Sequence, residues 1–167
     1  LDVAQNKLVI TDGAVDPATF DARTKDEKKE DYGMKGVSAI GKEWYEQADA
    51  FCEYVIGKTG AEIAALETKE ETGHNVAVDE TLYAGCSMDI TAFVDAFSKA
   101  CNDDGAREFT ADEFKLGLSA ISTVSEATSA TAEEDGKANM YTEFAAVAVD
   151  KDGKLLADVI DTIQPKI

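Results

Sequence analysis

The sequence predicts an α+β fold, with an antiparallel β-sheet packed on one face by two main helices and a short third helix. Apolar residues recur every three or four positions in residues 38–56 and 90–101, which is the spacing of one helix face. From about residue 114 the apolar residues alternate with polar ones, which is the spacing of a half-buried strand. A chain of 167 residues fits a single domain with a sizeable core.

The N-terminal region begins with a predicted strand over residues 1–11, followed by a turn at Asp12–Gly13. Residues 14–36 are polar and charged, so we expect a surface excursion there.

The first helix is predicted from about Ser38 to Ile56. Its apolar stripe consists of Ile40, Trp44, Ala48, Phe51, Cys52 and Val55. Gly57 is placed as a left-handed C-cap. Thr59 and Glu62 then form a capping box, which predicts a second, shorter helix.

The middle of the chain is expected to be polar over residues 67–80, with a turn at Thr72–Gly73 and a short extended piece at residues 81–83. A third helix follows, with a stripe formed by Ile90, Phe93, Val94, Phe97 and Cys101. Its start can be capped by Ser87 or Asp89, because either side-chain oxygen can accept a hydrogen bond from a backbone N–H. The run Asn102 to Gly105 is expected to stop the helix.

Three strands are predicted in the C-terminal region, at about 114–124, 138–149 and 155–163. A hairpin joins the last two, with Gly153 supplying a positive φ. In the last strand, the face that carries Leu155, Val159 and Ile163 is the more apolar, and we expect it to lie on helices.

The net charge of −18 excludes some classes of partner. A nucleic-acid backbone or an anionic membrane would be repelled, so neither is expected as a partner. The negative charge serves to keep the protein soluble, or it provides an acidic surface suited to cations or a basic partner. No apolar run reaches the roughly 20 residues that span a bilayer. Because the sequence starts at Leu1 without a signal segment, we expect a processed product or a cut piece.

The common catalytic and metal-binding patterns are missing from the sequence. Cys52 and Cys101 are expected to act as small apolar residues, and no C-x-x-C accompanies the single histidine, His74, which we expect to be exposed. Asp150 and Asp152 begin like a calcium loop, but Leu155 stands where that loop needs Gly, so a plain hairpin is preferred.

Carboxylates are expected to be solvated rather than catalytic. Glu43, Glu46 and Glu53 fall on the polar face of the first helix, where nothing apolar would raise a pKa. Trp44 is expected in the core. We therefore predict no catalytic residue and no metal site.

The segment from Tyr83 to Thr91 is the best candidate for a binding site. It opens the third helix with small residues and a hydroxyl, and the backbone N–H groups of such a turn can hold a phosphate. Ordinary helix capping is the preferred explanation of the same residues. The candidate cofactor-binding residues are Gly85, Cys86, Ser87 and Asp89.

Three stretches together resemble FMN-binding domains of bacterial envelope flavoproteins. They are AGCSMDITAFVDAFSKA, VAVDKDGKLLADVIDTIQPK, and the helix with Trp44, Gln47, Gly57, Lys58, Thr59 and Glu62. The resemblance covers most of residues 32–167, and it extends to repeat units of Gram-positive cell-surface lipoproteins. In the family a Thr of S-G-A-T can carry FMN through a phosphoester bond. Ser87 matches that Thr, whereas Ala84 and Cys86 replace the leading Ser and the Ala.

An internal match suggests a tandem repeat. Residues 1–8 read LDVAQNKL and residues 160–167 read IDTIQPKI, with Asp, Gln and Lys at the same offsets. A period near 159 would explain the match, with residues 1–11 equivalent to 155–167; chance similarity of two strands is the alternative.

Two functions are expected from these observations. The first is a non-enzymatic, exported cell-surface module that binds an unknown small molecule or surface protein, or serves as a spacer, without a cofactor. The second is a flavin carrier in extracytoplasmic electron transfer, with FMN at or near Ser87. A hydrolase or metal enzyme is a distant third. In all three cases we expect an extracellular location attached to the cell envelope.

Overall fold

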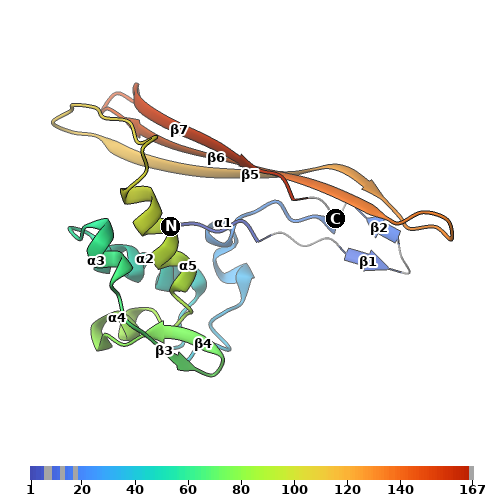
Figure 1. Ribbon diagram of the computed structural model, residues 1–167, viewed down its shortest axis with the longest axis horizontal. Helices are drawn as coiled ribbons and strands as arrows, with labels where there is room; N and C mark the ends of the chain where they lie inside the picture. The colour runs from blue at the N-terminus through green and yellow to red at the C-terminus, as the bar shows by residue number, and fades with distance from the viewer. Residues whose placement is uncertain (6–8, 12–13, 17–18, 166–167) are drawn as a thin grey trace. The chain divides into compact units, whose positions relative to one another are not determined.

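Helices and antiparallel strands are both present, so the chain has an α+β fold (Figure 1). The computed structural model describes residues 1–5, 9–11, 14–16 and 19–165. The chain divides into two compact units, one with residues 1–2 and 25–106 and the other with residues 3–24 and 107–167. The expected packing of helices on the main sheet concerns the placement of one unit against the other, and it stays a prediction. The expectation of one domain in a tandem repeat also stays a prediction.

The first unit contains the helices and a short hairpin. Its elements are α1 (Lys25–Lys28), the 3₁₀ helix η2 (Lys29–Tyr32), α2 (Trp44–Val55), α3 (Gly60–Ala64), β3 (Thr68–Glu71), β4 (His74–Ala77), α4 (Glu80–Gly85) and α5 (Thr91–Cys101). The two longest helices, α2 and α5, are those that the apolar spacing predicts.

The apolar stripes of α2 and α5 pack on each other. The ring of Phe93 lies edge-on to Trp44 and Phe51, with centroid distances of 6.3 Å and 5.4 Å. Phe51 also meets Phe97 at 5.4 Å. Trp44 and Phe51 are almost completely buried, so the expectation that Trp44 belongs to the core is confirmed. Burial of these large rings is the main stabilising contribution in this unit.

The prediction that the first helix begins near Ser38 is wrong, because α2 begins at Trp44. The Ser38 hydroxyl accepts hydrogen bonds from the N–H groups of Ile40 and Lys42, and Gly41 has a φ of +64°. These side chain–backbone bonds favour a turn over a helix. An apolar residue in helical register, such as Ile40, therefore lies outside the helix.

The predicted link between α2 and α3 is confirmed. Gly57 has a φ of +84°, the left-handed conformation that favours glycine after a helix. Thr59 is the N-cap of α3, its hydroxyl accepts the N–H of Glu62, and the Glu62 carboxylate accepts the N–H of Thr59.

The region after α3 is more ordered than predicted. Residues expected to form a polar stretch make the antiparallel β3–β4 hairpin, whose turn lies at Thr72 and Gly73 as predicted, with φ values of +52° and +82°. The expectation of an extended piece at residues 81–83 is wrong, because these residues lie in α4. Asp79 explains the difference, since its carboxylate accepts the N–H of Leu82 and caps that helix.

The N-terminal part of the second unit differs from the single strand predicted over residues 1–11. Strand β1 covers Val9–Thr11 and pairs with β2 (Ala14–Asp16). Residues 1–5 are not in a strand, while residues 6–8 and the predicted turn at 12–13 lie outside the described residues. The expected surface excursion over residues 14–36 contains β2, α1 and η2, which its charged composition did not indicate.

The main sheet confirms the three predicted strands, although the first runs farther than expected. Strands β5 (Lys115–Thr128), β6 (Lys137–Val149) and β7 (Leu155–Ile163) form an antiparallel sheet in the order β5-β6-β7. Gly153 has a φ of +80° in the hairpin between β6 and β7, as predicted. Among the described strands, β5 and β7 are the two edges.

Large aliphatic side chains are exposed on both faces of the edge strands. They are Leu116, Leu118, Ile121, Leu155, Val159, Ile160 and Ile163. Leu118 and Val159 lie on one face, because both align with Ala146 of β6. Ile160 lies on the opposite face and is 71% exposed. Exposed aliphatic residues at a sheet edge are typical of surfaces that bind another chain.

Candidate functional site

The candidate binding segment forms a turn between α4 and α5 (Figure 1). Gly85 ends α4, and a Cβ atom at this position would lie 2.9 Å from the Cβ of Ala50. A side chain would therefore clash, and glycine allows α4 to approach α2 closely. The role of Gly85 in this structure is to permit packing.

Cys86 is completely buried, and its N–H donates to the carbonyl oxygen of Leu82 at 2.7 Å. Burial raises the pKa of its thiol to about 11. The sulfur is therefore protonated at neutral pH, which suits a small core residue and not a nucleophile. Cys52 is half-buried, whereas Cys101 is exposed, so the expectation that Cys101 serves as a core residue is wrong. The last turn of α5 turns its side chain outward.

Ser87 is held by Gln47 of α2. The N–H of Ser87 donates to Oε1 of Gln47 at 2.9 Å, and its hydroxyl donates to the same oxygen at 3.3 Å. The serine is half-buried, so its hydroxyl is both partly accessible and already engaged. This contact ties the turn to α2.

Gln47 is the polar centre of the turn, and the sequence interpretation assigned it no structural role. Its side chain is almost completely buried, and Nε2 donates to the Ser38 hydroxyl at 3.0 Å and to the Lys42 carbonyl at 3.1 Å. Its position three residues after Trp44, on the buried stripe, is the signal that could have identified it. Buried amides need partners for every donor and acceptor, and Gln47 joins three chain segments for this reason.

The expected cap by Ser87 or Asp89 is not formed, because the N-cap of α5 is Ile90 without a side-chain cap; Asp89, one residue earlier, instead accepts the N–H of the first helical residue. One carboxylate oxygen accepts the N–H of Thr91 and the other accepts the N–H of Asn75, both at 2.9 Å. The hydrogen bond from Asn75 is the main reason that the pKa of Asp89 lies below its usual value. A negative charge therefore already lies where a bound phosphate would meet the helix dipole.

The acidic residues at the start of α2 hydrogen-bond to nearby backbone N–H groups. Glu43 is buried, contrary to the expected solvated face, because its carboxylate accepts the N–H of Met34 at 2.8 Å. The Glu46 carboxylate accepts the N–H of Glu43 and caps the helix. Glu53 is exposed, as expected.

The remaining candidates are His74 and the aspartates of the β6–β7 hairpin. His74 is exposed, as expected, although it begins β4 instead of lying in a loop. Asp150 accepts the N–H groups of Asp152 and Lys154 within the hairpin turn. Within residues 1–5, 9–11, 14–16 and 19–165, no three His, Cys, Asp or Glu side chains gather as a metal site would require.

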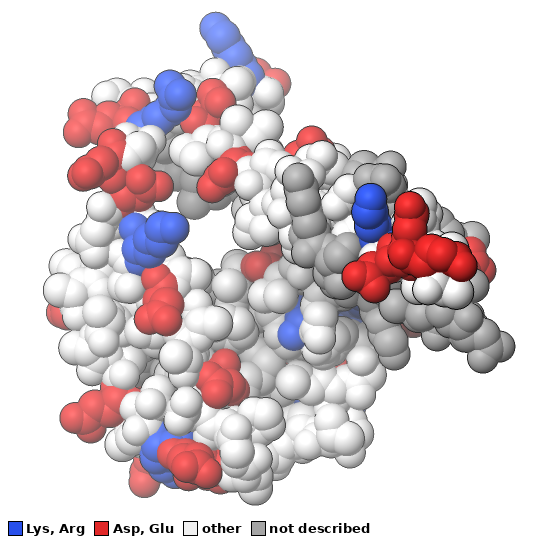
Figure 2. All heavy atoms as spheres, turned by 45° about the vertical axis from the view of Figure 1, so that its right-hand side comes forward, with Lys and Arg blue, Asp and Glu red and all other residues white. Residues whose placement is uncertain are grey.

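Acidic side chains occur in several separate groups on the face drawn in Figure 2. In the described part of the chain, no helix has the length and apolar content needed to cross a membrane.

Comparison with known proteins finds a short match. The chain is 48% identical over 44 residues to a protein named chlorophenol reductase from Desulfitobacterium hafniense. The match covers 26% of this chain and 14% of the length of that protein. No protein-family model matches the sequence, and no solved structure matches the chain.

Proposed function

We propose that the chain is a non-enzymatic, exported domain of the cell surface that binds a ligand or partner, or serves as a spacer. One observation carries the proposal: the polar groups in the turn between α4 and α5 are already hydrogen-bonded to other parts of the chain. One carboxylate oxygen of Asp89 accepts the N–H of Thr91 in α5 and the other accepts the N–H of Asn75 in β4, and Gln47 engages the amide and the hydroxyl of Ser87. A phosphate there would have to displace these bonds and approach a carboxylate.

The surface of the main sheet supports a binding role. Aliphatic side chains on both edge strands are exposed, and such surfaces favour contact with another protein. The resemblance to repeat units of cell-surface lipoproteins supports the extracellular, envelope-attached location.

The second candidate function is a flavin carrier in extracytoplasmic electron transfer, with FMN at or near Ser87. It is favoured by the match with a protein named as a reductase and by the resemblance of residues 84–91 to the flavin-attachment segment. Ser87 is half-buried, and its esterification would release the hydrogen bond that its hydroxyl donates to Gln47. Flavin would then supply the redox chemistry, and the protein would supply its position.

An absorption spectrum and an intact mass of protein purified from its native host distinguish the two. We expect colourless protein with the mass of the unmodified chain. A flavin absorption band, with a mass increase of one FMN that disappears in Ser87→Ala and persists in Ser87→Thr, would establish the carrier instead. The native host matters because attachment through a phosphoester bond requires a transferase.

A further inference from the structure

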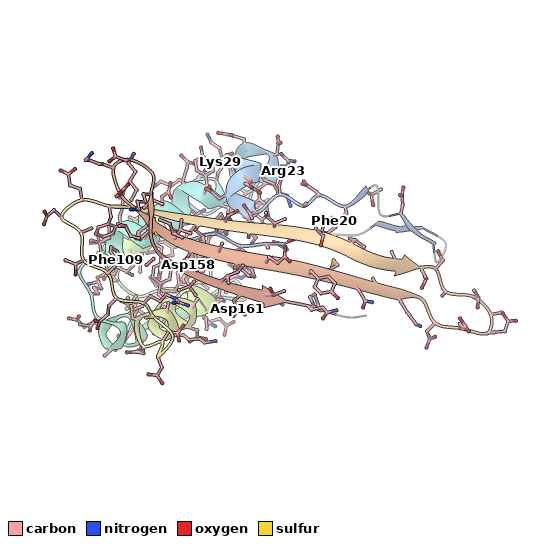
Figure 3. The ribbon with its side chains drawn as sticks, turned by 90° about the horizontal axis from the view of Figure 1, so that it is seen from above. Phe20, Arg23, Lys29, Phe109, Asp158 and Asp161 are labelled. Carbon is pink, nitrogen blue, oxygen red and sulfur yellow. The ribbon has the colours of Figure 1, made fainter. Side chains whose placement is uncertain are left out.

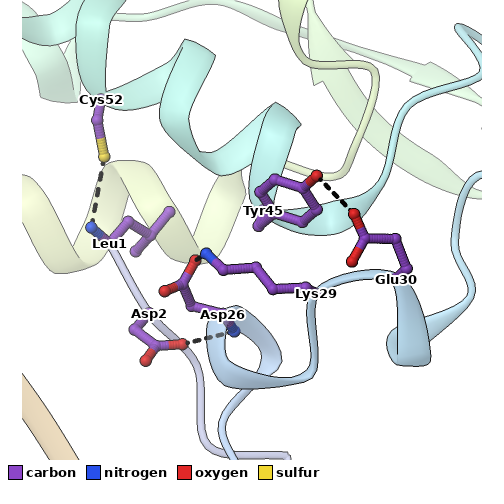
Figure 4. A network of polar contacts seen from close by, with 7 residues as sticks. All are labelled: Leu1, Asp2, Asp26, Lys29, Glu30, Tyr45 and Cys52. Atoms are coloured by element: carbon purple, nitrogen blue, oxygen red, sulfur yellow. Dashed lines mark hydrogen bonds and ion pairs between the residues drawn. The ribbon is translucent and has the colours of Figure 1, made fainter.

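The first residues of the chain lie on the helical unit. The nitrogen of Leu1 lies 3.4 Å from Sγ of Cys52 in α2, and Oδ1 of Asp2 accepts the N–H of Asp26 in α1 at 3.1 Å (Figure 4). Leu1 and Asp2 are both half-buried. The chain then passes into the second unit at Val3.

The matching residues at the other end of the chain have a different setting. Ile160 and Asp161 belong to β7, where they align with Ala145 and Phe144 of β6. Asp161 is labelled on this strand in Figure 3. Both side chains are exposed. The Met140 N–H donates to the Pro165 carbonyl at 3.2 Å, so the chain follows β6 beyond the end of β7.

We propose that Ile160 and Asp161 of one copy of this chain dock onto the helical unit of a second copy, at the place that Leu1 and Asp2 take here. The second copy follows the first in a tandem array, so that residues 160–167 of one repeat serve as residues 1–8 of the next. The docking surface is formed by Cys52 of α2 and the Asp26 amide of α1.

In β7 the Asp161 carboxylate accepts the N–H of Thr162 at 2.8 Å, and a carboxylate can accept further hydrogen bonds. In the sheet, β7 pairs with β6 along one edge, and no described strand pairs with its other edge. On the helical unit, the contact of Asp2 is made by its carboxylate. Aspartate is the residue that both segments share at this position, and its carboxylate is the group that the Asp26 amide requires.

The exposure of the C-terminal segment fits the same arrangement. Ile160 is 71% exposed, although an aliphatic residue at an edge strand is normally protected or replaced by a charge. Docking would cover this side chain. The sheet of one repeat would then join the helices of the next without a flexible linker, and this holds for either candidate function.

A tandem protein tests the proposal by disulfide trapping. Residues 1–159 are followed directly by residues 1–167, with Leu1→Cys at the junction and Cys101→Ser in both copies. One version carries Cys52→Ser in the first copy, and the other version carries it in the second copy. We expect mild oxidation to link the junction cysteine to Cys52 only when the second copy retains Cys52, because a disulfide needs two residues close together and the nitrogen of residue 1 lies 3.4 Å from Sγ of Cys52.

The matched control keeps Leu1 at the junction and carries Lys154→Cys in the first copy instead. Lys154 is exposed and directly precedes β7. We expect no disulfide between this cysteine and the second copy. Hydrogen exchange of the first copy measures whether its β7 amides stay protected. Absence of the junction disulfide overturns the proposal. Loss of β7 protection in the linked protein also overturns it, because the strand would have left the sheet to dock.

The single chain provides an independent test. The sequence IDTI replaces residues 1–4 in one variant, and LDVA replaces residues 160–163 in another. We expect each Tm to remain within about 3 °C of the parent, which is roughly the effect of 1 kcal/mol in a protein of this size. A larger loss in either variant overturns the proposal, because the segments would not be interchangeable.

Discussion

At the scale of single residues, the buried amide of Gln47 determines how the turn after α4 is held. It donates to Ser38 and Lys42 of one turn and accepts from Ser87 of another, which makes it the shared partner of two turns. Each bond contributes modestly, but a buried group left without its partner is costly. The stability of the candidate site therefore depends on a residue outside it.

Replacing Gln47 by leucine tests this role. Leucine has a similar size but cannot bond, so the Ser87 amide and the Lys42 carbonyl each lose a partner. We expect Gln47→Leu to lower the free energy of unfolding by about 1–3 kcal/mol in urea denaturation. Gln164→Leu, at an exposed glutamine whose hydrogen bond to the Tyr141 hydroxyl water can replace, should change it by less than about 0.5 kcal/mol. Equal effects of the two substitutions would show that the buried hydrogen bonds of Gln47 contribute no more to stability than those of an exposed glutamine.

At the scale of an element, the stability of the short helix α3 depends on its capping box. Five residues are too few for a helix to be stable through its backbone bonds alone. Hydrogen bonds from the Thr59 N–H and hydroxyl to the Glu62 carboxylate lower the pKa of that carboxyl below its usual value. The ionised form of Glu62 therefore favours the folded helix.

The capping box predicts a pH dependence. Because the pKa of Glu62 is lower in the folded state, its stabilising contribution is present above the unfolded value of about 4.3 and is lost as the pH falls through the folded value. The difference in urea midpoint between the parent and Glu62→Gln should be present at neutral pH and shrink on acidification. The same comparison in a Thr59→Ala background should show a smaller pH dependence. A midpoint difference that is constant with pH would contradict the assignment.

At the scale of the whole molecule, the acidic composition sets the long-range electrostatics. A net charge of −18 produces self-repulsion that the folded state concentrates into a smaller volume than the unfolded state. Salt screens this repulsion, since the Debye length falls from about 30 Å at 0.01 M to about 10 Å at 0.1 M. The protein should therefore be least stable at low ionic strength.

Thermal unfolding at neutral pH measures this effect. We expect Tm to rise by about 2–4 °C between 0.01 M and 0.1 M NaCl, which corresponds to roughly 1 kcal/mol. Potassium chloride should give the same rise, because screening depends on ionic strength and not on the cation. A rise that occurs with calcium but not with sodium at equal ionic strength would indicate a specific cation site instead.

The sequence by itself determined the elements whose signals are local. The stripes of α2 and α5, the capping box of α3, the positive φ of Gly57 and Gly153, and the alternation in β5, β6 and β7 all arise from residues within a few positions of one another. The short hairpin and α4 were missed, because their polar residues carry little periodicity. Turn and cap residues such as Asp79 were the available signal for α4.

Only the tertiary structure decided which polar groups are buried and which partners satisfy them. Gln47 and Ser87 are 40 residues apart, and Asn75 and Asp89 are 14 apart, so no local pattern could pair them. Glu43 is buried for the same reason, since Met34 supplies its hydrogen bond from the preceding turn. A buried polar group is tolerated only where the folded chain brings it a partner, and that depends on contacts between distant segments.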